Sequence, residues 1–221
     1  KIRISPASVI SLARTIRSAS AEKLFYLVDV LALLQNGALS CDSERLYGEG
    51  VIEGLCRRKG NLLSEVWKWT SGFLWKRRIN SVSIIATKSD LVIGGFNREN
   101  MVSLADELFG RALAFLDRSY VASEILSCAA VCGTKEVLVD GEKGLQGKLE
   151  CQGSGEGNTD VKIWVPSDVP TRFPTSSEEW NRMIAEGKFN YQSAFPWFES
   201  AQICPPRQLG LNQLVKRIFD R

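Results

Sequence analysis

The stretch that decides the fold is SVSIIATKSDLVIGGF, which occupies residues 81–96. Two apolar runs, residues 81–86 and 91–96, flank the polar tetrapeptide Thr87-Lys88-Ser89-Asp90. Short apolar runs on either side of a polar turn are typical of a β-hairpin. The alternate residues expected to face a core are Val82, Ile84 and Ala86, with Ile85 out of phase. The stretch therefore predicts two paired strands.

An N-terminal helix at 1–19 and three further helices are expected before this hairpin. Ser20 can cap a helix at about residues 21–35, and Gly37 follows where a left-handed cap would lie. A short link, residues 38–41, leads to a second helix at about 42–58. Gly60-Asn61 then breaks the chain before a third helix at about 62–78.

After the hairpin the pattern partly repeats. Apolar residues at helical spacing predict the clearest amphipathic helix of the chain at 101–116, and a further helix is expected at about 120–131. Three strands are expected next, at 136–139, 145–151 and 161–165. They are joined by the turn at 140–144 and by the glycine-rich loop at 153–158.

The amino-acid composition changes at Pro166. Three prolines space out an extended segment, and Thr175–Glu179 offers a capping box for a short helix that ends at Gly187. The aromatic side chains that follow are expected to pack against the body of the protein. They are Trp180, Phe189, Tyr191, Phe195, Trp197 and Phe198. A final amphipathic helix is expected around residues 211–218.

The order of elements from residue 20 to residue 96 resembles a winged-helix domain, in which a helix-turn-helix is followed by a hairpin wing. The residues that carry the resemblance are the link Ala38–Cys41, the break Gly60-Asn61 and the turn Thr87–Asp90. Residues 97–166 resemble a second copy that lacks one helix. An unrelated α+β domain stays open as the alternative.

The predicted fold class is therefore α+β, mostly helical with small antiparallel hairpins and with tandem winged helices as the candidate arrangement. The predicted parts are an N-terminal helix at 1–19, winged-helix-like units at 20–96 and 97–166, and an aromatic-rich segment with C-terminal helices at 167–221.

The 221-residue chain contains no histidine, which excludes Ser-His-Asp and Cys-His catalytic sites. Its six cysteines include no C-x-x-C pair, so we expect no metal site and interpret the thiols as buried apolar groups. No cofactor is expected, and an enzyme that works without histidine is the third class of function considered. A low cysteine density in a chain of this size favours a reducing compartment, cytoplasmic or nuclear.

The apolar runs and the first residue of the chain indicate whether to expect a membrane span, a signal peptide or a fragment. The longest apolar run, Leu24–Leu34, is interrupted by Asp29 and is too short to cross a bilayer. We expect neither a membrane span nor a signal peptide. Because the chain begins at Lys1 rather than methionine, we expect a fragment or a processed product.

The run Ile84–Asp90 resembles the base-reading loop of a GTPase, in which the aspartate would hold the guanine. A phosphate-binding motif of the form G-x-x-x-x-G-K-[ST] should accompany such a loop, and the 221 residues contain none. A polar turn between two strands accounts for the same tetrapeptide. From the sequence we therefore favour the turn.

Charge is distributed unevenly along the chain. Residues 1–80 carry 13 basic and 7 acidic side chains, whereas residues 81–167 carry 8 and 12. Basic clusters at Arg57–Lys59 and Lys76–Arg78, together with nearby tryptophans, predict a nucleic-acid surface as one alternative. The acidic middle of the chain would repel a phosphate backbone, so the second unit is not expected to bind DNA.

The function favoured by the sequence is a non-catalytic protein–protein interaction module within a larger assembly. Tryptophan and arginine are the side chains that anchor protein interfaces. The predicted partner-binding residues are Trp69, Trp75, Lys76, Arg77 and Arg78. The alternative is a nucleic-acid-binding protein that uses the basic N-terminal part, and the sequence does not indicate the oligomeric state.

Overall fold

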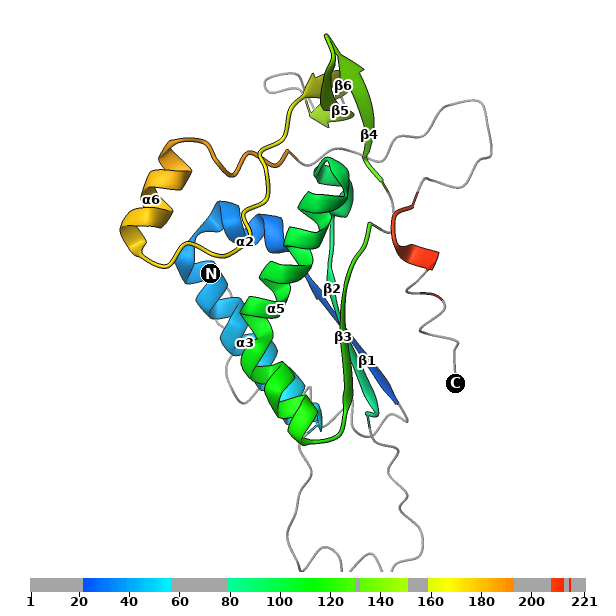
Figure 1. Cartoon of the computed structure of the whole chain (residues 1–221), viewed down its shortest axis with the longest axis vertical. Helices are drawn as coiled ribbons and strands as arrows, with labels where there is room; N and C mark the ends of the chain where they lie inside the picture. The colour runs from blue at the N-terminus through cyan, green and yellow to red at the C-terminus, as the bar shows by residue number, and fades with distance from the viewer. Residues whose placement is uncertain are drawn as a thin grey trace, which may run out of the picture. The chain divides into compact units, whose positions relative to one another are not determined.

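The structure is a computed structural model that describes residues 22–56, 79–129, 132–150, 159–192, 208–212 and 215. These residues form a mixture of helices and two three-stranded sheets, which confirms the predicted combination of helix and sheet (Figure 1). In chain order the elements are β1 (Lys23–Val28), α2 (Val30–Asn36), α3 (Ala38–Cys56), β2 (Ser81–Ala86), the 3-10 turn η1 (Ser89–Leu91), α5 (Gly94–Arg118), β3 (Ala122–Ser127), β4 (Thr134–Val139), β5 (Glu142–Glu150), β6 (Thr159–Trp164) and α6 (Ser177–Ala185).

The first sheet has the strand order β1-β2-β3, with β2 in the centre. At one end the Asn80 N–H donates to the Glu22 carbonyl, and at the other the Thr87 N–H donates to the Val28 carbonyl. Residue numbers rise in the same direction on both strands, so β1 and β2 are parallel. The bonds from Ala122 to Asn80 and from Cys128 to Ala86 show the same for β2 and β3.

The predicted hairpin at residues 81–96 is wrong in its second half. The strand at 81–86 is confirmed as β2, but Leu91 ends η1, residues 92–93 belong to no element and residues 94–96 begin α5. Residues 82–86 of β2 are all buried, including Ile85, because a central parallel strand is covered on both faces. The interruption at Ile85 was therefore the mark of a doubly buried strand, not a flaw in a hairpin.

Two predicted helices prove to be strands in whole or in part. The segment at about 120–131 contains β3, and the segment at about 21–35 contains β1 followed by the short helix α2. The expected link at residues 38–41 is the first turn of α3. Because the hairpin needed as a wing is absent, the winged-helix arrangement is not found in residues 22–56 and 79–96. The predicted helix at 62–78 lies outside the described residues.

The helix α5 is the connection that makes the parallel pair β2 and β3 possible, because parallel neighbours need a crossover. Its predicted core at 101–116 is confirmed, and it begins earlier, at Gly94, whose φ is +77°. Gly37, with φ +86°, ends α2 as expected. Its conformation allows α3 to follow at once.

The second sheet is an antiparallel meander, β4-β5-β6, and it confirms the three strands predicted at 136–139, 145–151 and 161–165 to within three residues at their starts. Val139 pairs with Glu142 across a two-residue turn in which Asp140 and Gly141 both have positive φ. Turns of this kind match the twist of the strands they join.

The segment that follows β6 packs by polar and aromatic contacts. The predicted capping box is confirmed, since the Ser176 hydroxyl accepts a hydrogen bond from the Glu179 N–H at the start of α6. Trp180 lies between Phe173 and Phe189, with ring centroids 6.3 and 5.8 Å away. The Gln35 amide donates to the carbonyls of Phe189 and Tyr191. The other predicted aromatic residues, Phe195, Trp197 and Phe198, lie outside the described residues.

The chain divides into two compact units, each made of three separate stretches of the sequence. Unit 1 combines residues 1–26, 43–84 and 109–124, and unit 2 combines residues 27–42, 85–108 and 125–221. The core of unit 1 includes Phe109, which is fully buried and makes an edge-on ring contact with Tyr26. Among the described residues, no helix is long and apolar enough to cross a membrane.

Candidate functional site

Several polar residues of unit 2 lie where the three parallel strands end. Asp29 follows β1, Thr87–Asp90 follows β2, and Cys128 follows β3. In open sheets with parallel strands, ligands bind outside the carboxyl ends of the strands. We therefore take this edge as the candidate functional site.

Thr87 and Lys88 connect the end of β2 to the end of β1. The Thr87 N–H and hydroxyl both donate to the Val28 carbonyl, at 2.8 and 3.2 Å. Lys88 adopts a left-handed backbone conformation, with φ +61°, and its Nζ lies 2.6 Å from Oδ2 of Asp29. The other carboxylate oxygen of Asp29 caps α2 by accepting from the Ala32 N–H at 3.0 Å. The tetrapeptide is thus held in one conformation.

Asp90 lies at the inner end of the tetrapeptide and is 7% exposed. Its Oδ2 accepts a hydrogen bond of 2.7 Å from the Gly133 N–H, and its carbonyl accepts one from the Thr134 hydroxyl. Burial raises the pKa of Asp90, and the backbone N–H groups of Gly133, Asp90 and Thr134 together with the charge of Lys88 only partly oppose this. The carboxyl group is therefore buried, and its hydrogen bonds offset only part of the cost of burying its charge.

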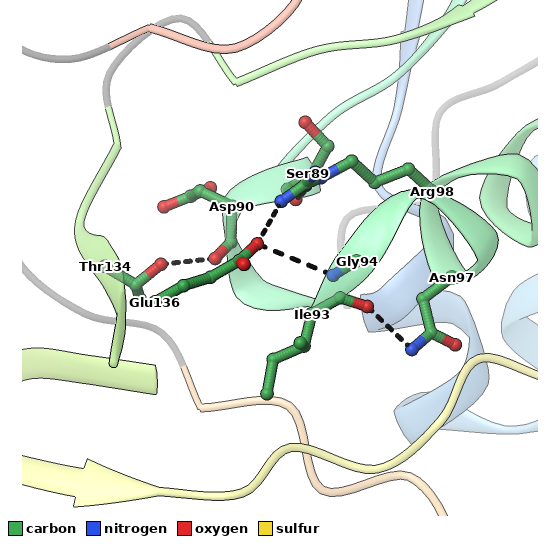
Figure 2. A network of polar contacts seen from close by, with 8 residues as sticks. All are labelled: Ser89, Asp90, Ile93, Gly94, Asn97, Arg98, Thr134 and Glu136. Carbon is green, nitrogen blue, oxygen red and sulfur yellow. Dashed lines mark hydrogen bonds and ion pairs between the residues drawn. The ribbon is translucent and has the colours of Figure 1, made fainter. Parts of the chain in front are cut away.

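Arg98, on the first turns of α5, links this loop to β4. Its Nε donates to the Ser89 carbonyl at 3.2 Å, and its guanidinium lies 2.7 Å from Oε1 of Glu136 (Figure 2). The same glutamate oxygen accepts from the Gly94 N–H at 3.5 Å. The sequence alone does not single out Arg98, Glu136 or Gly133 as site residues. They lie on separate elements, and no local pattern brings them together.

The end of β3 is paired with a distant segment. Ala129 and Leu209 exchange two backbone hydrogen bonds, of 2.9 and 3.0 Å. Gly210 has φ +70°, and a Cβ there would meet the Ser127 carbonyl oxygen at 2.5 Å. Glycine is therefore required at position 210 for the chain to approach this strand end so closely.

Glu136 yields a prediction about pH. Burial would raise its pKa, but the hydrogen bonds from Arg98 and Gly94 and the charges of Arg98 and Lys143 together hold it below the ordinary value of 4.5. A lowered folded-state pKa means that this contact stabilises the fold above about pH 4.5 and is lost as the pH falls through the folded-state value. Arg98→Gln is expected to raise the pKa of Glu136 towards 4.5, measured by NMR titration of the side-chain carboxyl carbon.

The control for this titration is Lys162→Gln on β6, which removes a positive charge from the same sheet without touching Glu136. It is expected to leave the titration of Glu136 unchanged. A pKa of Glu136 that is the same in wild type and in Arg98→Gln would contradict the interpretation.

The structure does not test the interaction residues predicted from the sequence. Trp69, Trp75, Lys76, Arg77 and Arg78 all lie outside the described residues. The prediction that the cysteines are buried is confirmed for those in the described part of the chain, which are Cys41, Cys56, Cys128 and Cys132. Within that part no group of three or more acidic or cysteine side chains is placed to hold a metal ion.

Comparison with known proteins places the chain in a family. A family model described as the YcjX-like family, DUF463, matches residues 18–219 of the 221. Comparison with functionally curated proteins gives no match. The match covers nearly the whole chain, including both sheets and the polar edge of the parallel strands. The chain therefore belongs to the YcjX-like family, DUF463.

Proposed function

We propose that the edge formed by Asp29, Thr87–Asp90 and Cys128 holds the base of a guanine nucleotide. The observation that carries the proposal is the position of Thr87–Asp90. It follows the central strand of a parallel sheet and leads into η1 and α5. Residues 91–96 do not form a strand, so Thr87–Asp90 is not the turn of a hairpin.

The chemistry of Asp90 suits guanine. An ionised carboxylate only accepts hydrogen bonds, and guanine presents two adjacent donors, the N1–H and the 2-amino group. Adenine offers an acceptor at N1 beside its amino donor and would leave one carboxylate oxygen facing a lone pair. An aspartate at this position therefore selects guanine by leaving the wrong base unpaired.

The proposal concerns the base and not hydrolysis. The 221 residues contain no G-x-x-x-x-G-K-[ST] motif, and nothing described at this edge corresponds to a phosphate cradle. The expectation that the chain is not itself an enzyme stays a prediction.

The protein-interaction role predicted from the sequence also stays a prediction, and one observation in unit 2 favours it. Alternate residues along β6 and just beyond it, Val161, Ile163 and Val165, are 49%, 52% and 61% exposed. Exposed apolar residues on one strand face are the kind of surface that a protein partner covers. The nucleic-acid alternative depends mainly on basic residues outside the described part of the chain.

The base-binding proposal predicts an order of nucleotide affinities. GDP is expected to bind more tightly than inosine diphosphate by about tenfold, because inosine lacks the 2-amino donor and a hydrogen bond to a charged acceptor contributes about 1.5 kcal/mol or more. ADP is expected to bind more weakly still. Titration calorimetry on the protein at its natural full length measures all three. Equal affinities for GDP and ADP would contradict the proposal.

A further inference from the structure

Asp90 is covered by the segment that precedes and begins β4. The Gly133 N–H donates to Oδ2 of Asp90 at 2.7 Å, and the Thr134 hydroxyl donates to the Asp90 carbonyl. Cys132 and Thr134 are themselves only 5% and 7% exposed. We call residues 132–136 the strap. A purine ring cannot reach a carboxylate that this strap covers.

The strap is held to the base-reading loop from its other end as well. Glu136 contacts both the Arg98 guanidinium and the Gly94 N–H, and Arg98 also donates to the Ser89 carbonyl (Figure 2). Contacts at residues 133, 134 and 136 therefore all reach the loop and the first turns of α5. They are polar contacts, so each can be exchanged for a hydrogen bond to a ligand or to water.

We propose that the strap is an autoinhibitory element, which must leave Asp90 before a guanine base can bind there. This inference rests on the proposed function. The Gly133 N–H already contacts Oδ2 of Asp90, and Asp90 is 7% exposed, so a base can approach both carboxylate oxygens only after the strap has moved. Binding of the base therefore moves the strap and the start of β4 away from the loop, and docking of the strap weakens nucleotide binding.

The size of the effect follows from population arithmetic. When only a fraction of the molecules is open, the apparent affinity is reduced by that fraction. The Arg98 and Glu136 side chains are 25% and 35% exposed, and a pair of this kind shifts an equilibrium by no more than about fivefold. Removing the pair is expected to tighten nucleotide binding about threefold to fivefold.

The test uses Glu136→Ala in the full-length protein, with Glu142→Ala as the matched control. Glu142 is an exposed glutamate at the start of β5, in the same hairpin as Glu136. The first measurement is the dissociation constant of a fluorescent GDP analogue. The second is hydrogen exchange at the Gly133 amide, with and without GDP. We expect tighter binding in Glu136→Ala only, and faster exchange at Gly133 when GDP is added to the wild type.

The outcomes separate the two proposals. If neither the wild type nor Glu136→Ala binds GDP, both the proposed function and the autoinhibitory role of the strap are wrong. If both bind GDP equally well and the Gly133 amide keeps its protection at saturating GDP, the proposed function stands and the autoinhibitory role is overturned. Should Glu136→Ala fail to fold by circular dichroism, the exchange of Gly133 in the wild type decides the question alone.

Discussion

Asp90→Asn is expected to turn a preference for guanine into a preference for xanthine. Asparagine replaces two acceptors by one acceptor and one donor, and xanthine carries a carbonyl where guanine carries the 2-amino group. Loss of a bidentate contact costs about 1–3 kcal/mol, so the affinity for GDP should fall by about tenfold to a hundredfold. The affinity for xanthosine diphosphate should rise in the same variant. Titration calorimetry with both nucleotides measures the exchange.

The control for this exchange is Asp140→Asn, the same chemical change in the exposed turn between β4 and β5. Asparagine tolerates the positive φ of position 140, so the fold should be unaffected. Its nucleotide preference is expected to match the wild type. If Asp90→Asn weakened GDP without any gain for xanthosine diphosphate, Asp90 would be acting on the fold and not on the base.

Phe109→Ala is expected to lower the free energy of unfolding by about 3–5 kcal/mol. Phe109 is fully buried in unit 1, 5.2 Å from the ring of Tyr26, and its ring lies so close to Gly48 that a Cβ there would clash. Its removal leaves a cavity in the core of unit 1. Since domains are stable by only about 5–15 kcal/mol, this loss is a large share of the total. Urea denaturation monitored by circular dichroism gives the value.

Phe96→Ala is the matched control for this substitution, because Phe96 lies on the same helix and is 68% exposed. Its effect is expected to stay within about 0.5 kcal/mol. Equal losses in the two variants would show that Phe109 is not part of a closely packed core.

The sequence alone determined the elements whose signals are local. The meander of β4, β5 and β6 was predicted because its strands pair across short connections and the turn at Asp140-Gly141 has a distinctive composition. The start of α6 was predicted because Ser176 and Glu179 form their capping contact three residues apart. The tetrapeptide Thr87–Asp90 was likewise noticed in the sequence. A strand at 91–96 would make it a hairpin turn, whereas in the structure it leads into η1 and α5.

Tertiary structure decided the elements whose partners lie far away in the chain. β1 and β3 were predicted as parts of helices because neither sequence, KLFYLV or ASEILS, alternates strictly between apolar and polar residues. They become strands through hydrogen bonds between residues 22 and 80 and between 80 and 122, which no local pattern encodes. The candidate site depends on the same long-range pairing, since Asp90 meets Gly133 across 43 residues. Local propensity sets turns and caps, whereas parallel strands form only when their distant partners in the chain are in place.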